Sequence, residues 1–150
     1  MALKARIDDD LKAALLERRR FVADTLRNLK AAILNEEVAT GRREEGLADA
    51  EIEGVIAREV KKRRESIALY EQNNRPELAA EEQQEIDVLA VYLPQQLTDD
   101  EIQAVIDEVI TGLGTVDSKA MGQVIGAVKA KCGTAADGAT VARLVKATLQ

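Results

Sequence analysis

The sequence predicts an all-α protein in which a region of long helices precedes a small unit of three helices. Apolar residues recur every three or four positions along nearly the whole chain, and no useful length alternates with the period of a strand. The composition also changes: residues 1–93 are rich in charge, whereas residues 112–140 are rich in Gly and Ala. We therefore expect a helical N-terminal region over residues 1–93 and a small helical tail-like domain over residues 94–150.

Four helices are expected in the N-terminal region. The second ends near Gly41, and the third is the longest and ends at the turn Asn73–Pro76. Pro76 fits the first turn of the fourth helix, where its missing N–H is no loss, and Pro94 ends that helix. The apolar positions are Leu3, Ile7, Leu11 and Leu15 in the first helix, Val22, Leu26, Leu29 and Ile33 in the second, Ile52, Ile56, Val60, Ile67 and Tyr70 in the third, and Ile86, Leu89 and Leu93 in the fourth.

The tail-like domain begins with a strong helix-start signal. Thr98 and Glu101 have the spacing of a capping box, and Leu97 and Ile102 occupy the two positions of a hydrophobic staple. The acids of this first turn suit the positive end of the helix dipole, so we interpret them as structural and expect no metal site. Gly112–Gly114 ends this fifth helix. The last two helices are predicted by Met121, Val124, Ile125 and Val128, stopping at Gly133, and by Val141, Leu144, Val145 and Leu149.

The composition excludes several kinds of chemistry. The chain has no His, so a His-activated nucleophile, a His-ligated metal and a His proton shuttle are excluded within one chain. The single cysteine, Cys132, cannot form an internal disulfide, and we expect it to be inert. No pair of carboxylates has a spacing typical of acid/base catalysis, and we expect no catalytic residue and no cofactor. The aromatic residues Phe21, Tyr70 and Tyr92 are too few for an extensive base-stacking platform.

The first residues turn acidic at once and contain no apolar core of a secretory signal, and no run of about 18 apolar residues is present. We therefore expect a cytoplasmic protein without a membrane span.

The net charge of −6 conceals an uneven distribution along the chain. Residues 1–75 carry 16 basic and 15 acidic side chains, residues 76–118 carry 11 acids and no cation, and residues 119–150 carry five bases and one acid. A polyanion is expected to approach the last segment more easily than the acidic middle. The alternative is a set of ordinary solvated helix faces. The candidate nucleic-acid-binding residues are Lys119, Lys129, Lys131, Arg143 and Lys146.

Two other basic runs, Arg18–Arg20 and Lys61–Arg64, have a composition seen in nucleic-acid patches. The second run is broken by acids on either side and is typical of an exposed helix. Arg63 differs, because it projects from the middle of the apolar stripe and needs a carboxylate. Glu59 and Asp87 are the candidate partners, and the sequence leaves open whether Arg63 is structural or part of a site.

Gly122 and Gly126 form a stripe of small residues along the sixth helix. Such a stripe allows another backbone to approach closely. One interpretation is tight packing against a neighbouring helix, and the other is close approach of an RNA backbone.

The sequence resembles the GatB/YqeY family over nearly its whole length. The residues that carry this resemblance are Leu26–Ile33 with Asn35–Glu37, Tyr92–Thr98 with Glu101, and Met121–Gly126 followed by Ala136–Gly138, Val141, Leu144, Val145, Lys146 and Leu149. Members are small stand-alone proteins similar to the C-terminal tail of the GatB subunit of the glutamine-dependent tRNA amidotransferase. The resemblance implies a helical N-terminal region and a helical tail, as the periodicity predicts.

In the amidotransferase this tail contacts tRNA, while the steps of amide formation with glutamine as nitrogen donor occur elsewhere in the assembly. The resemblance therefore implies kinship to carbon–nitrogen ligases without their catalytic machinery in this chain. It implies an accessory tRNA-associated protein, with tRNA or a protein of the aminoacyl-tRNA or transamidation machinery as partner. The alternative is a protein–protein interaction module without RNA contact. The family's usual lysines are missing from the turn Cys132–Ala139, which weakens the expected RNA contact.

Overall fold

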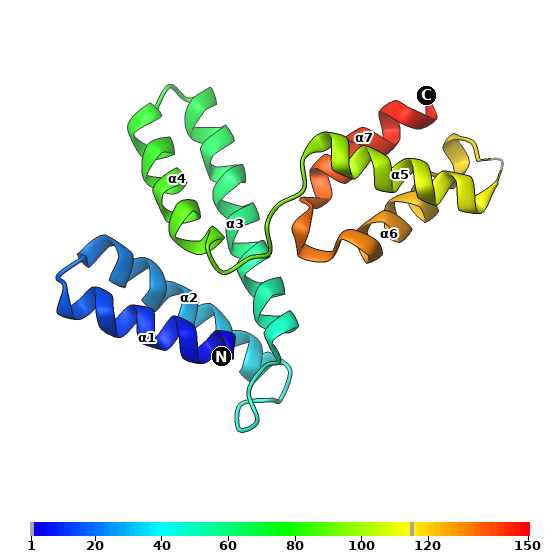
Figure 1. Cartoon of the computed structure of the whole chain (residues 1–150). Coiled ribbons are helices and arrows are strands. Elements are labelled where there is room, and N and C mark those ends of the chain that lie inside the picture. The colour runs from blue at the N-terminus through cyan, green and yellow to red at the C-terminus, as the bar shows by residue number, and fades with distance from the viewer. Residues whose placement is uncertain (1, 115) are drawn as a thin grey trace. The chain divides into compact units, whose positions relative to one another are not determined.

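A computed structural model describes residues 2–114 and 116–150, and over these residues it contains seven α-helices, two short 3-10 helices and no strand (Figure 1). The all-α prediction is confirmed. The chain divides into two compact units, Met1–Leu93 and Pro94–Gln150, and each has a hydrophobic core of its own. Among the described helices, none is both long and apolar enough to cross a membrane.

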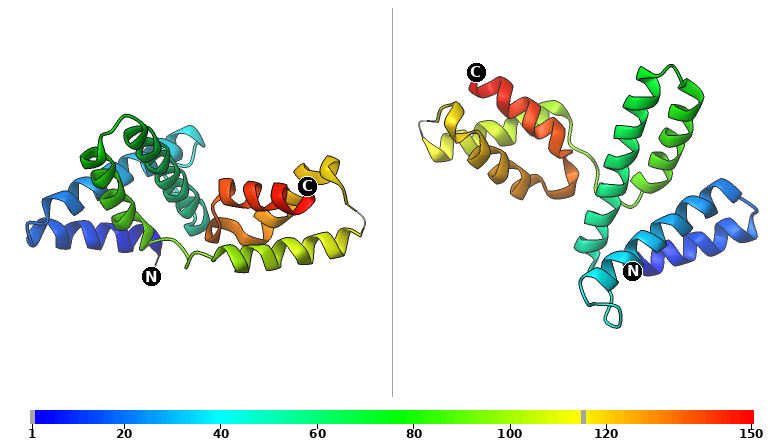
Figure 2. Two further views of the ribbon diagram at one scale, coloured as in Figure 1. Left: turned by 90° about the horizontal axis from the view of Figure 1, so that it is seen from above. Right: turned by 180° about the vertical axis from the view of Figure 1, so that it is seen from behind.

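The N-terminal unit consists of two helical hairpins (Figures 1 and 2). The first pairs α1 (Leu3–Leu16) with α2 (Arg20–Ala39), and the second pairs α3 (Asp49–Gln72) with α4 (Pro76–Ala90). The boundaries agree with the signals in the sequence, since α4 begins at Pro76 and α3 is the longest helix, with 24 residues. The fourth helix stops at Ala90, before the predicted end at Pro94. Leu93, expected among its apolar positions, therefore lies outside the helix and is only partly buried against the core.

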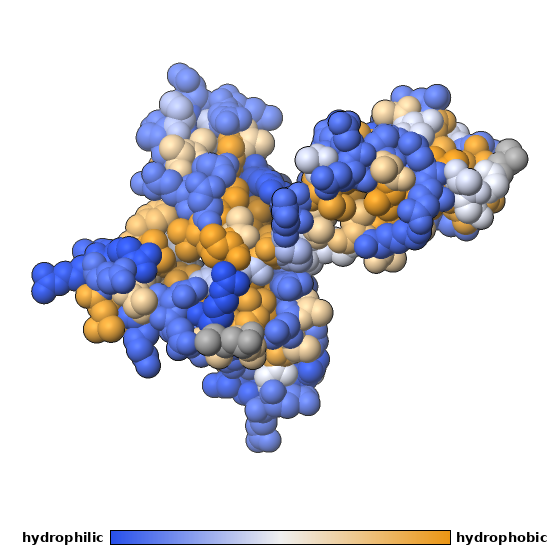
Figure 3. Space-filling model, in the orientation of Figure 1, coloured by the Kyte–Doolittle hydropathy of each residue, from blue (hydrophilic) through white to orange (hydrophobic). Residues whose placement is uncertain are grey.

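The core of this unit joins all four helices. Ile7 of α1, Leu26 of α2, Ile56 of α3 and Leu89 of α4 are each at most 1% exposed, and they belong to one continuous cluster. Leu15 does not belong to it: this residue of the expected stripe is 47% exposed, and its neighbour Ala14 is buried instead. Figure 3 shows polar residues over the outer faces of the helices, with apolar residues visible between them.

The C-terminal unit is a bundle of α5 (Asp99–Leu113), α6 (Met121–Cys132) and α7 (Gly138–Leu149). Ser118–Ala120 and Gly133–Ala135 form the two 3-10 turns before and after α6. The bundle is packed around apolar side chains that all lie at the predicted helical spacing: Ile102, Ile106, Val109, Val124, Val128, Val141 and Val145.

The capping box at the start of α5 is formed as the sequence predicts. The Glu101 amide donates to the Thr98 hydroxyl at 3.1 Å, and the Thr98 amide donates to the Glu101 carboxylate at 3.4 Å. Leu97 packs against the core that contains Ile102, as expected for the staple, and its amide donates to the Ala135 carbonyl at 2.8 Å. The entry into α5 is therefore tied both to its own first turn and to the turn before α7.

We expect the substitution Thr98→Ala to lower the stability of the C-terminal unit by about 1 kcal/mol, because the Glu101 amide loses its acceptor. Hydrogen exchange of the α5 amides, followed by NMR, measures this change directly. The control is Thr98→Ser, which keeps the hydroxyl and should retain most of the protection. Equal loss of protection in the two variants would contradict a capping role for the hydroxyl.

Candidate nucleic-acid interface

The five cations predicted to contact RNA all lie exposed in the C-terminal unit. Lys119 lies in the short turn before α6, Lys129 and Lys131 lie in the last turn of α6, and Arg143 and Lys146 lie in α7. The fold of one small bundle thus carries all of them, although they come from three different elements.

Two of the five cations are paired with acids of α5. The Lys131 Nζ lies 2.9 Å from a carboxylate oxygen of Glu108, and an Arg143 guanidinium nitrogen lies 3.1 Å from one of Asp99. Exposed pairs of this kind contribute little to stability, but each places a negative charge beside a cation. Residues 94–150 carry seven acids against the five cations. Six acids of the acidic segment therefore share the surface of one bundle with the basic tail, although the two are separate along the sequence.

The other three cations form no ion pair within the described part of the chain. Lys119 and Lys146 are exposed. Lys129 extends over the start of α7, since its Nζ lies 3.3 Å from the position that a Cβ on Gly138 would occupy. These three side chains are the part of the tail that remains best suited to an anionic partner.

Gly122 and Gly126 do not pack tightly against a neighbouring helix. Both are exposed, and a Cβ built on either would meet nothing within 4 Å. The core side of α6 is formed by Val124 and Val128, which leaves the glycines on the opposite side. The packing interpretation of this stripe is therefore wrong within the described chain, and the interpretation as an approach site for RNA stays a prediction.

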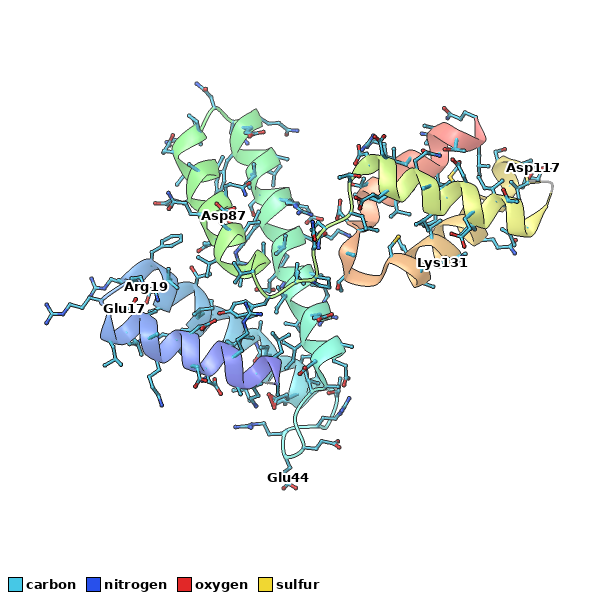
Figure 4. All side chains as sticks on the ribbon, viewed as in Figure 1. Glu17, Arg19, Glu44, Asp87, Asp117 and Lys131 are labelled. Atoms are coloured by element: carbon cyan, nitrogen blue, oxygen red, sulfur yellow. The ribbon has the colours of Figure 1, made fainter. Side chains whose placement is uncertain are left out.

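A second cationic surface lies at the turn between α1 and α2, outside the five candidate residues predicted from the sequence. Arg18 adopts a left-handed conformation with φ of 57°, and the Arg19 Nε lies 2.7 Å from a Glu17 carboxylate oxygen (Figure 4). One groove of about 510 Å³, the arginine groove, is lined by Arg18, Arg20 and Arg27. Three consecutive arginines are visible in the sequence, but only the geometry of the turn brings two of them together with Arg27.

Apolar side chains are exposed at the same turn. Leu16 is 79% exposed and Phe21, next to Arg20, is 39% exposed. Among the described residues, Asp24 is the one acid that lines the arginine groove, and its Oδ1 lies 3.4 Å from the Arg27 Nη1. The turn therefore combines guanidinium groups with an accessible aromatic ring. That combination suits a partner with phosphate groups and stackable rings.

The family model described as Yqey-like protein matches residues 4–149. The chain belongs to the YqeY-like family. The resemblance stated from the sequence is thereby confirmed. A curated relative, "Altered inheritance of mitochondria protein 41, mitochondrial" from Vanderwaltozyma polyspora, is 28% identical over an alignment of 117 residues that covers 73% of this chain. The chain spans 62% of that relative, less than two thirds of its length.

Arg63 of this YqeY-like protein is held in an ion-pair network between α3 and α4. Its Nε donates to the Glu85 Oε2 at 3.0 Å. Its Nη1 donates to the Glu59 carbonyl at 3.0 Å and lies 3.5 Å from the Glu59 Oε1. Of the two candidate partners, Glu59 is confirmed and Asp87 is wrong, because Glu85 is the partner on α4. Asp87 is exposed and accepts a hydrogen bond from Gln83, and Figure 4 shows it on the outer side of α4.

Cys132 is buried at the end of α6, and burial raises the pKa of its thiol. A raised pKa lowers the fraction of reactive thiolate, which agrees with an inert side chain. Within residues 2–114 and 116–150, no three Cys, Asp or Glu side chains gather as they would around a metal ion.

Proposed function

We propose that this YqeY-like protein is an accessory protein that contacts the phosphate backbone of tRNA and takes no catalytic part itself. One observation carries the proposal: a single groove is lined by Arg18, Arg20 and Arg27. Phe21, which follows Arg20 in the sequence, is 39% exposed. The resemblance to the tRNA-contacting tail of the GatB subunit supports tRNA as the nucleic acid.

The arginine groove suits a phosphate backbone for two physical reasons. A guanidinium group presents a planar fork of donors that matches the oxygens of a phosphate. Neighbouring cations also gain from releasing the counterions condensed on the nucleic acid, so the affinity depends on salt. Phe21 offers a face on which an unpaired base can stack, without requiring a particular base.

The tail is the secondary contact in this proposal. Lys119, Lys129 and Lys146 have no acid partner in the described chain, whereas Lys131 and Arg143 are paired with α5 carboxylates. Binding through a paired cation requires displacement of its carboxylate, which reduces the gain. We therefore expect the arginine groove to contribute more to RNA affinity than the five tail cations.

We expect the double variant Arg18→Glu/Arg20→Glu to bind tRNA about tenfold more weakly at low salt and to lose roughly 1–2 units of the slope of log affinity against log salt. Binding of fluorescently labelled tRNA between about 50 and 200 mM salt measures both quantities. The matched control is Lys61→Glu/Arg75→Glu, which reverses two exposed cations of the same unit away from the groove.

Three outcomes would contradict the proposal in different ways. Equal losses of tRNA affinity in the groove variant and its control would mean that binding depends on the net charge of the protein and not on the groove. A loss confined to Lys129→Glu/Lys146→Glu would place the contact in the tail. No binding of the unaltered protein at low salt would remove the tRNA role and favour the alternative of a protein-interaction module.

A further inference from the structure

A second cavity in the N-terminal unit contains a buried carboxylate that the proposed RNA contact does not use. The cavity measures about 300 Å³ and lies between the start of α1, the second half of α2 and the loop after α2. Ile7, Ile33 and Leu34 form its apolar lining. It shares no lining residue with the arginine groove.

Glu37 is the central charged group of this cavity. Its side chain is only 2% exposed, which is unusual for a carboxylate because burial of a charge without partners costs several kcal/mol. Its Oε1 accepts a hydrogen bond from the Lys4 Nζ at 3.3 Å. Its Oε2 is buried and has no hydrogen-bond donor, and the guanidinium of Arg43 comes no closer to it than 3.9 Å. One oxygen of a buried carboxylate is thus left for a donor from outside the chain.

Asp8 supplies a second carboxylate on the α1 side of the cavity, and its side chain is 44% exposed. Its Oδ1 atom is buried and forms an ion pair with the Lys30 Nζ at 2.8 Å. In the described chain these two oxygens are the buried side-chain atoms without a directed hydrogen bond, and both belong to residues that line this cavity. Of the two, the Glu37 Oε2 has no cation closer than 3.9 Å. Unsatisfied buried acceptors are rare in native structures, so the Glu37 Oε2 indicates a bound group that donates a hydrogen bond into this cavity.

The cations around the cavity indicate which charge the ligand carries besides its hydrogen-bond donor. Lys4, Lys30 and Arg43 line it together with the two carboxylates, so the positive charges exceed the negative ones by one. A simple organic cation would satisfy the carboxylates but add to this excess. Arg43 is 63% exposed and only loosely paired, which leaves its guanidinium available for an anionic group at the mouth. A ligand with one ammonium and one carboxylate satisfies both sets of charges.

We propose that this cavity binds a small zwitterion, with its ammonium on Glu37 and Asp8, its carboxylate on Arg43, and an apolar chain against Ile7 and Leu34. This is the chemistry of a free aliphatic α-amino acid. The inference is independent of the RNA contact, because it concerns other residues and another class of ligand.

The test uses L-leucine as the probe, with two analogues that each lack one charge. The first, 3-methylbutylamine, keeps the ammonium, and the second, 4-methylpentanoate, keeps the carboxylate. Titrations of the full-length protein followed by amide NMR should show saturable shifts at the cavity for leucine, with a dissociation constant of about 1 mM for a ligand of this size. Each analogue should bind about tenfold more weakly.

Two substitutions and one control locate the site. Glu37→Gln keeps the shape of the side chain but removes its charge, and it should weaken leucine binding about tenfold. Arg43→Gln should weaken leucine binding and leave the weak binding of 3-methylbutylamine unchanged. Glu44→Gln is the matched control, because Glu44 lies at the exposed tip of the same loop, outside the cavity (Figure 4).

The result is decisive in either direction. No saturable shift up to about 20 mM leucine, or equal binding by Glu37→Gln and the unaltered protein, would overturn the proposal. Equal affinity for leucine and 3-methylbutylamine would overturn the zwitterion in favour of a simple cation. Should Glu37→Gln fail to fold, Arg43→Gln decides the outcome, since this exposed side chain is not part of the core.

Discussion

Replacing Ile56 with Ala should lower the free energy of unfolding of the N-terminal unit by about 3 kcal/mol. Ile56 is fully buried in α3, in the cluster that joins all four helices of this unit. Its truncation removes apolar contacts and leaves a cavity that the four surrounding helices cannot fill completely. A loss of this size is a large part of the stability of a small domain.

Urea unfolding followed by tyrosine fluorescence measures this change selectively. Both tyrosines of the chain, Tyr70 and Tyr92, lie in the N-terminal unit, and the sequence has no Trp. The C-terminal unit is therefore silent in this measurement. The control is Leu16→Ala, because Leu16 is 79% exposed and its truncation should change stability by less than about 0.5 kcal/mol. Similar midpoints for the two variants would contradict the assignment of Ile56 to the core.

Replacing Arg63 with Ala should destabilise the N-terminal unit by about 2–3 kcal/mol at pH 7, because the partly buried Glu85 loses its cation and Glu59 keeps only the exposed Lys62. The Arg63 side chain is 13% exposed, and its partners Glu59 and Glu85 are 15% and 26% exposed. A third acid, Glu82, lies nearby, and its pKa is raised first by burial and then by the charge of Glu85. Arg63 therefore offsets repulsion within an acidic cluster.

The defect should become smaller as the pH falls from 7 to about 4. A carboxyl whose pKa is raised in the folded state favours folding while it is protonated, and this contribution is lost as the pH rises through that pKa. Without Arg63 the acids repel one another most at neutral pH and lose this repulsion when they protonate. Urea unfolding at both pH values, with Lys61→Ala as the exposed control, measures the difference. An equal defect at pH 7 and pH 4 would mean that Arg63 contributes packing alone.

Much of the fold follows from local physical chemistry. The spacing of Leu26, Leu29 and Ile33 predicts a buried helix face, because residues three and four apart lie on one side of a helix. Pro76 and Thr98 mark helix starts. Pro76 has no amide N–H that would remain unpaired in the first turn, and the Thr98 hydroxyl accepts a hydrogen bond from one of the unpaired amides. These signals involve residues within one helical turn of each other, so no knowledge of the rest of the molecule is needed to interpret them.

The candidate sites depend on contacts between residues far apart in the chain. Glu85, not Asp87, meets Arg63, because the register of α4 against α3 decides which acid faces inward. Glu108 and Asp99 neutralise two cations of the predicted RNA surface only after α5 packs against α6 and α7.

By itself, the sequence determined the all-helical fold, where most helices begin and end, and which family the chain resembles. The tertiary structure decided which charged side chains form ion pairs within the chain and which remain available to a partner. It also formed the arginine groove and the cavity around Glu37, in which side chains of α1 and α2 meet. The reason is that helix propensity and capping act within a few residues, whereas electrostatic pairing and burial act between whichever groups the packing brings together.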